Sequence, residues 1–129
     1  MDRQEQIDFI LDHYENPRRK GALPDAGASA QGSNPGCGDL VTMYVKVDPR
    51  TGRADVTFDG TGCTISQASA SYLSEFASGK TLEEVLTVDH DVWMDALGRE
   101  IAQQRPGCAM LPLDTLREAI GKLDRLQAL

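Results

Sequence analysis

The segment Asn34-Pro35-Gly36-Cys37-Gly38-Asp39 places a thiol and a carboxylate two residues apart, with a glycine on each side of the cysteine. The two other cysteines follow similar junctions, Gly60-Thr61-Gly62 before Cys63 and Arg105-Pro106-Gly107 before Cys108. Core cysteines normally fall within apolar runs, so this placement is unusual for packing alone. The pattern favours a fold that brings the junctions together into one metal or iron–sulfur site, with four predicted ligands: Cys37, Asp39, Cys63 and Cys108.

Three thiolates and one carboxylate are four donors, which suits a tetrahedral ion. Thiolates also hold iron–sulfur clusters, and a harder carboxylate oxygen would hold such a cluster weakly. The cysteine spacing matches no zinc finger, since the chain has no paired C-x₂-C knuckle. The alternative is that each cysteine is a small buried hydrophobe.

Length and charge limit the other possibilities. The 129 residues predict a single domain, 1–129. A net charge of −7 argues against nucleic acid or an anionic membrane as the partner. The polar N-terminus has no signal-peptide core, and no apolar run approaches the ~20 residues of a membrane span. We therefore expect a cytoplasmic protein with reduced thiols.

The first half of the chain predicts a helix followed by a hairpin. Apolar residues with helical spacing mark a helix over residues 3–16, ended by Asn16-Pro17. The glycine- and proline-containing stretch 18–36 is typical of a loop, which would carry Cys37 on a pliable arm. Period-two alternation predicts strands over 41–47 and 53–59, joined by a turn at 48–52.

The second half predicts helices. Thr64 or Ser66 is expected to cap a helix that ends near Ser78, and Thr81 to open a short one. A further helix carries Trp93, capped by Asp89 or Asp91. The last helix runs from about residue 108 to 126, where Pro112 is acceptable if it lies in the first turn.

The three cysteine motifs resemble those of the U-type iron–sulfur cluster assembly proteins, namely IscU, SufU and the N-terminal domain of NifU. The resemblance is collinear over nearly the whole chain. It also includes Asp12-His13-Tyr14-Glu15-Asn16-Pro17-Arg18 at the end of the first helix and the run from Gly60 to Ser71. In the IscU branch a histidine precedes the third cysteine, where this chain has Gly107, as SufU does. SufU chains usually carry an insertion of about twenty residues before that cysteine, a change of low thermodynamic cost, and this chain lacks it.

The resemblance implies an α+β fold of the SufE/NifU/IscU type, a small three-stranded antiparallel sheet with helices packed on one face. The third strand, within residues 25–34, is expected from the resemblance alone. It further implies a scaffold that accepts persulfide sulfur from a cysteine desulfurase of the SufS or IscS type. The cluster, 2Fe-2S in type, would then pass to apo iron–sulfur proteins.

Residue roles follow from this reading. Cys37 is the expected sulfur acceptor, with Cys108 as the alternative, and Asp39 is the expected labile ligand. A close rival is a zinc-bound sulfur acceptor that uses the same four residues. A structural zinc module for protein binding is a third reading. A cysteine hydrolase is disfavoured, because neither His13 nor His90 is tied in sequence to a cysteine.

Overall fold

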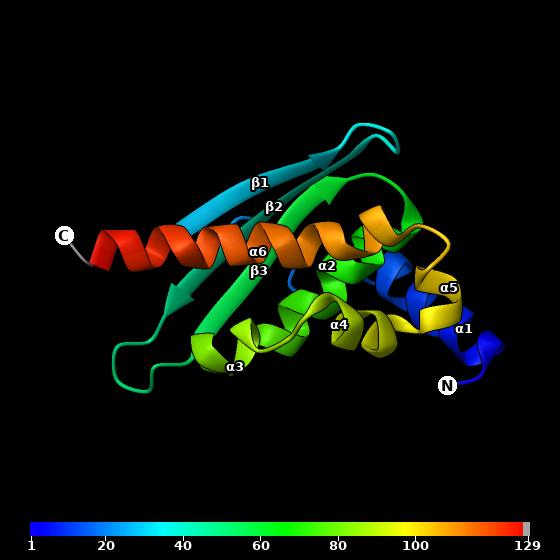
Figure 1. Cartoon of the computed structure of the whole chain (residues 1–129). Coiled ribbons are helices and arrows are strands. Elements are labelled where there is room, and N and C mark those ends of the chain that lie inside the picture. The colour runs from blue at the N-terminus through cyan, green and yellow to red at the C-terminus, as the bar shows by residue number, and fades with distance from the viewer. Residues whose placement is uncertain (128–129) are drawn as a thin grey trace.

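One antiparallel sheet carries the fold, with strands in the order β1 (Ala28–Asn34), β2 (Asp39–Val47) and β3 (Ala54–Thr61) (Figure 1). The computed structural model describes residues 1–127, and their side chains to residue 123. The predicted alternation in β2 is confirmed, because Val41, Met43 and Val45 are fully buried while Thr42 and Tyr44 are only partly so. Helices α2 (Thr64–Ala77) and α6 (Pro106–Gln127) pack against the sheet, which confirms the α+β fold.

Strand β1 corrects the loop predicted over 18–36 and agrees with the strand that the resemblance implied. Its sequence, Ala-Ser-Ala-Gln-Gly-Ser-Asn, has weak strand propensity because it lacks β-branched and aromatic residues. The small residues have a packing reason. A Cβ at Gly32 would lie 2.2 Å from Thr115 Oγ1 on α6, so the helix approaches the strand too closely for a side chain there.

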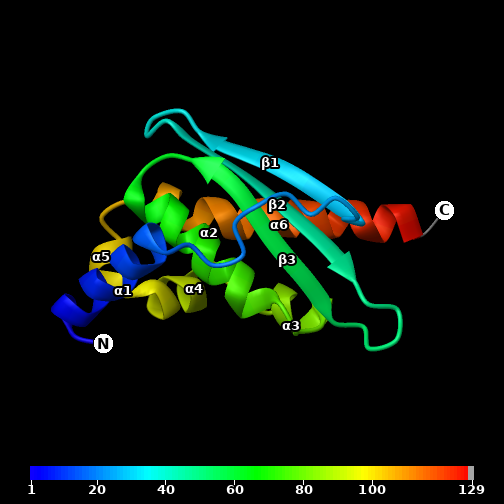
Figure 2. The same cartoon turned by 180° about the vertical axis from the view of Figure 1, so that it is seen from behind.

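Helix α1 (Arg3–Glu15) is confirmed, and the chain then crosses the sheet to reach β1 (Figure 2). Gly21 N–H donates to the Phe58 carbonyl at 2.7 Å, so the connection first pairs with the outer edge of β3. Lys46 on β2 then forms an ion pair with Asp25 of the connection at 2.7 Å. These contacts protect an edge strand that would otherwise expose unpaired backbone groups.

The N-cap of α2 lies one residue before Thr64 and three before Ser66, the two predicted caps. Cys63 itself is the N-cap, and its Sγ accepts the Ser66 N–H at 3.4 Å. The small residues 68–71 are all buried, which allows α2 to pack closely on its neighbours. Ser69 shows why small polar residues fit here, because its Oγ donates to the Ala109 carbonyl at 2.8 Å and accepts the Trp93 indole N–H at 3.0 Å.

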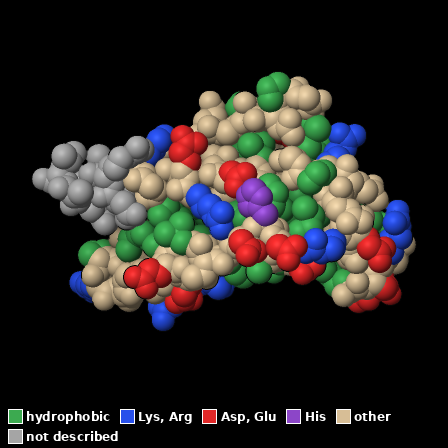
Figure 3. Space-filling view, in the orientation of Figure 1, with side chains coloured by type: hydrophobic (Ala, Val, Ile, Leu, Met, Phe, Trp, Pro, Cys, Tyr) green, Lys and Arg blue, Asp and Glu red, His purple; other side chains and the backbone are tan. Residues whose placement is uncertain are grey.

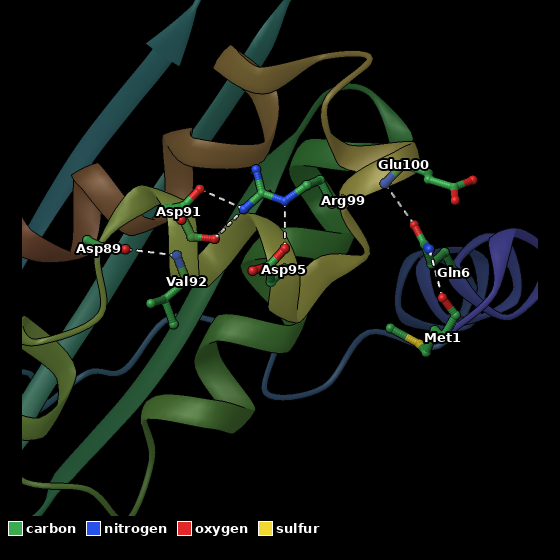
Figure 4. Close-up of polar contacts among 8 residues, drawn as sticks. All are labelled: Met1, Gln6, Asp89, Asp91, Val92, Asp95, Arg99 and Glu100. Carbon is green, nitrogen blue, oxygen red and sulfur yellow. Dashed lines mark hydrogen bonds and ion pairs between the residues drawn. The ribbon is translucent and has the colours of Figure 1, made fainter.

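Three short helices lead to the third cysteine: α3 (Leu82–Leu86), α4 (His90–Leu97) and α5 (Arg99–Ala102). No pattern in the sequence predicted α5. Thr81 caps α3 and Asp89, rather than Asp91, caps α4. Arg99 binds both Asp91 and Asp95, which ties α5 back onto α4 (Figure 4).

A buried glutamine fixes α5 against α1. Gln6 Oε1 accepts the Glu100 N–H at 2.9 Å, and Nε2 donates to the Met1 carbonyl at 3.0 Å (Figure 4). Gly98 has a φ of +107° and packs on Gln6, where a Cβ would lie 2.6 Å from Cγ. This joint sets the path of the chain into α6.

Helix α6 starts earlier than predicted, because Arg105-Pro106-Gly107 opens the helix instead of breaking the chain. Proline is well suited to the first helical position, where its missing N–H has no partner to lose. Pro112 lies beyond the first turn, so the Cys108 carbonyl receives no helical N–H from it. An apolar stripe with helical spacing along α6 forms part of the core: Leu113, Leu116, Ile120 and Leu123.

The surface carries charges of both signs. Acidic and basic side chains are interspersed with apolar ones on the face shown in Figure 3. Among residues 1–127, no helix combines the length and the apolar character that crossing a membrane requires.

Candidate metal centre

Cys37 lies in the tight turn between β1 and β2. Asn34 and Asp39 form the last pair of the two strands. Within the turn the Cys37 N–H donates to the Asn34 carbonyl at 3.1 Å, and Gly38 has a φ of +69°. A left-handed residue next to the cysteine is readily supplied by glycine. The predicted long pliable arm is therefore wrong, because a four-residue turn on a paired hairpin carries Cys37.

Asp39 begins β2 and is only 3% exposed. Its Oδ1 accepts the Cys63 N–H at 2.8 Å, and its Oδ2 lies 3.9 Å from the Cys63 Sγ. A Cβ at Gly62 would lie 2.4 Å from Asp39 Oδ1, so glycine is required for this approach. Burial raises the pKa of Asp39, but hydrogen bonds from Cys108, Cys63 and Ser66 outweigh it and leave the pKa below its usual value.

Cys63 ends the loop after β3 and caps α2, as described above. The cap places its sulfur at the positive end of the α2 dipole. The predicted position of Cys63 at a helix start is thus confirmed in a stronger sense, because the sulfur is itself the capping atom.

Cys108 lies in the first turn of α6 and is 1% exposed. Its Sγ is 3.6 Å from Asn34 Nδ2, which brings the β1 end of the hairpin onto the helix. Gly107 allows this contact, since a Cβ there would be 3.1 Å from the same Nδ2. Burial, followed by hydrogen bonding to Asp39, raises the pKa of the Cys108 thiol above its usual value.

The fold brings three of the four predicted ligands into one group. One ligand atom each from Cys37, Asp39 and Cys108 lies within 4.8 Å of the others. Cys63 falls outside that group but touches it through Asp39. The donors come from three separate stretches of chain, and their chemistry, soft sulfur with one carboxylate oxygen, fits zinc or an iron–sulfur cluster.

Two further residues contact the sulfurs and were not singled out from the sequence. Arg105 Nη1 lies 3.3 Å from the Cys37 Sγ, and Asn34 contacts Cys108. The hydrogen bond to the Cys37 sulfur is the main cause that raises the pKa of Arg105 above its usual value. Both residues stand within the quoted motifs, but their sequence positions did not indicate contact with a sulfur from another segment.

Solvent reaches this group from one side. A cavity of ≈ 400 Å³ is lined by Cys37, Cys63, Thr64, Ile65 and Arg105. Asp39 and Cys108 lie beneath it and are buried. A reacting group from outside would therefore meet Cys37 or Cys63 before Cys108.

Comparison with known proteins agrees with this geometry. The family model described as "NifU-like N terminal domain" matches residues 5–128. The chain belongs to this family. It is 39% identical to "Iron-sulfur cluster assembly scaffold protein IscU 1" of Archaeoglobus fulgidus, over 95% of this chain and 83% of that protein. The scaffold protein IscU of Aquifex aeolicus is 37% identical, over 86% of this chain and 71% of that protein.

Solved structures of this family have the same fold. A putative iron–sulfur cluster assembly scaffold protein for the SUF system from Fervidobacterium islandicum superposes with a TM-score of 0.71 and 30% identity, covering 87% of this chain and 93% of that chain. A NifU-like N-terminal protein from Brucella abortus gives a TM-score of 0.75 at 22% identity, covering 93% and 98%. The second likeness supports the fold alone. The fold and the family expected from the sequence are therefore confirmed.

Proposed function

We propose that this chain is a scaffold on which an iron–sulfur cluster is assembled from delivered sulfur and iron and then passed to an apo-protein. The observation that carries the proposal is the convergence of Cys37, Asp39 and Cys108 within 4.8 Å, with Cys63 beside Asp39, in a chain of the NifU-like family. The cluster, of the 2Fe-2S type, is the cargo of the site. Its proposed ligands are the three cysteines and Asp39, and Asp39 is the ligand that is released most easily.

Cys37 is the proposed sulfur acceptor. It lines the open cavity, whereas the alternative acceptor, Cys108, is 1% exposed. The Arg105 guanidinium lies 3.3 Å from the Cys37 sulfur and places a positive charge beside the proposed attacking atom. These observations replace the loop mobility that the sequence suggested.

The transfer step is a thiol–persulfide exchange. The Cys37 thiolate attacks the terminal sulfur of a persulfide on the partner desulfurase. A new sulfur–sulfur bond forms on Cys37 as the bond in the donor breaks, and the desulfurase cysteine leaves as a thiolate. The exchange needs no external oxidant or reductant.

The zinc-bound sulfur acceptor is the second candidate. Four single-atom donors with no histidine among them favour it, because the set fits a tetrahedral ion. Zinc would be held by Cys37, Asp39, Cys63 and Cys108 and would keep the thiols deprotonated. A zinc module for protein binding is the third candidate. The cytoplasmic location stays a prediction.

Sulfur uptake and cluster transfer together test the proposal. Each Cys→Ser variant is mixed with a cysteine desulfurase and cysteine, and intact mass with peptide mapping locates the added sulfur. We expect Cys37→Ser to lose uptake, and Arg105→Gln to slow it roughly tenfold because the variant removes the positive charge beside the Cys37 sulfur. Arg50→Gln, in the distant β2–β3 turn, is the matched control. Anaerobic addition of ferrous iron together with a thiol reductant, which supplies the electrons that convert persulfide sulfur to sulfide, should then give a coloured protein that activates an apo-ferredoxin.

Two results would contradict this account. Uptake at the wild-type rate in Cys37→Ser but not in Cys108→Ser would make Cys108 the acceptor. Normal sulfur uptake without any transferable cluster would favour the zinc-bound acceptor over the scaffold.

A further inference from the structure

A second cavity lies behind the Cys63 loop and contains none of the four predicted ligands. Its volume is ≈ 270 Å³. His13, Tyr14 and Pro17 at the end of α1 line one side, and the stretch 60–62 with Gln67 of α2 lines the other. Lys20 also lines it. Gly62 is the residue directly before Cys63, so the cavity and the metal centre share one loop.

Gln67 carries a polar atom in this wall without a partner. The residue is 7% exposed, and its Nε2 donates to Ser66 Oγ at 3.3 Å. Its Oε1 is buried and accepts no hydrogen bond from any residue in the described part of the chain. Buried polar atoms in folded proteins are almost always paired, with protein groups, ordered water or a ligand, so this oxygen has capacity for a hydrogen-bond donor from outside the chain.

The opposite wall provides donors. His13 Nδ1 lies 2.8 Å from Ser71 Oγ, and the same oxygen accepts the Arg18 N–H at 2.8 Å. When the Ser71 hydroxyl proton is directed at Nδ1, a neutral imidazole carries its proton on Nε2 and can donate it to a bound group; in the other tautomer Nδ1–H donates to Ser71 Oγ. Burial, and then the charge of Arg18, lowers the pKa of His13, consistent with a neutral ring.

Lys20 adds a cation at the rim. Its side chain is exposed, and it forms no ion pair with the residues that the structure describes. The cavity thus combines one free ammonium group, an imidazole donor and a single unpaired acceptor. Pro17 and Tyr14 supply apolar surface beside them.

We propose that this cavity binds a small amphipathic carboxylate with an adjacent hydrogen-bond donor, as in a free apolar α-amino acid. The carboxylate faces Lys20 and His13, the ammonium group donates to Gln67 Oε1, and the side chain lies against Pro17 and Tyr14. The volume is at the small end for ligand pockets, which suits a molecule of this size. Inorganic phosphate fits the cavity less well, because its anionic oxygens would lie against Gln67 Oε1, which is itself a hydrogen-bond acceptor.

Backbone amide NMR during titration tests the proposal. L-leucine, L-valine and L-methionine are the probes, with 3-methylbutylamine and 4-methylpentanoate as leucine analogues that lack the carboxylate or the amine. We expect saturable shifts at Gly60, Gly62 and Gln67 with at least one amino acid. Loss of either charged group should weaken binding by roughly tenfold. The readout is independent of cluster assembly, so it holds whether or not the proposed function does.

Substitutions then assign the contacts. Lys20→Gln should weaken binding of the amino acid roughly tenfold, while Arg50→Gln, which removes the same charge in the distant turn, should leave it unchanged. Gln67→Met should weaken the amino acid but not 4-methylpentanoate, because only the amino acid donates to Oε1. Three results would overturn the proposal: no saturable shift with any of the three amino acids, unchanged binding in Lys20→Gln, or equally tight binding of inorganic phosphate at the same amides.

Discussion

Asp39 links two parts of the site through its two carboxylate oxygens. Oδ1 accepts the Cys63 N–H, and Oδ2 faces the sulfur of the same residue. The side chain therefore holds the Cys63 loop in place and also offers the one hard ligand in a set of soft ones. When a cluster held partly by this oxygen is transferred, the bond to the Asp39 oxygen is expected to break first.

Replacing this carboxylate should lengthen the lifetime of a bound cluster. We expect Asp39→Ala, reconstituted anaerobically, to transfer its cluster to an apo-ferredoxin several times more slowly than the wild type. Asp39→Asn can still accept the Cys63 N–H, so it separates the ligand role from the structural one. Asp114→Ala, on the exposed side of α6, is the control. Transfer from Asp39→Ala as fast as from the wild type would contradict the labile-ligand role.

The start of α2 shows how one residue serves both an element and the site. Cys63 caps the helix with its sulfur, and the Ser66 N–H is the group it satisfies. A serine oxygen accepts the same hydrogen bond, whereas alanine leaves the N–H without a side-chain partner. The cysteine is thus a structural residue as well as a proposed ligand.

The capping role predicts different stabilities for two variants. In metal-free protein, Cys63→Ser should keep nearly the wild-type free energy of unfolding, and Cys63→Ala should lose about 1 kcal/mol. Both should fail to hold the cluster. Urea denaturation followed by circular dichroism gives the comparison, and equal stabilities of the two variants would show that the sulfur does not cap α2.

The packing of α1 on α2 should make stability depend on pH. His13 is buried between Phe9 and Tyr72, with ring centroids 4.8 and 5.4 Å away. Burial, and then the charge of Arg18, lowers its pKa from 6.5, against the opposing charges of Glu75 and Asp12. The unfolded chain then binds more protons than the folded one, so stability is complete above the unfolded pKa and falls as the pH drops below it.

The measurement is the free energy of unfolding between pH 7.5 and 5.5. We expect it to fall over this range in the wild type, and His13→Gln to reduce the slope. His90→Gln, which keeps His13, should retain it. A slope unchanged by His13→Gln would mean that another group is responsible.

The elements that could be predicted from sequence were those with a periodic apolar pattern. The hairpin from β2 to β3 and the apolar stripe of α6 are examples, because one buried face dictates their residues. Strand β1 could not be predicted from its own residues, because the glycine at position 32 is required by close packing against Thr115, eighty-three positions away. Helix α5 depends likewise on Gln6 of α1.

The site follows the same division. The three cysteines and Asp39 stood out because their glycine-rich surroundings are unusual for a core. Asn34 and Arg105 did not, because each contacts a sulfur brought from another segment by the complete fold. The reason first given for Cys37 as acceptor was wrong, although the residue itself remains the proposal.

At the scale of the whole molecule, the site exists only where three parts of the fold meet. The β1–β2 turn, the cap of α2 and the first turn of α6 each bring donors, and none of these segments could form the group alone. Binding of a metal or cluster should therefore be coupled to folding of the entire chain. Both candidate functions require this single shared site.

X-ray absorption at the zinc edge of zinc-loaded protein tests that claim most directly. The account predicts one zinc per chain with three sulfur neighbours at about 2.3 Å and one oxygen at about 2.0–2.2 Å, and loss of the oxygen as a protein ligand in Asp39→Asn. Two or fewer sulfur neighbours, or the multiple-scattering pattern of a histidine ring, would contradict a site made by Cys37, Asp39, Cys63 and Cys108.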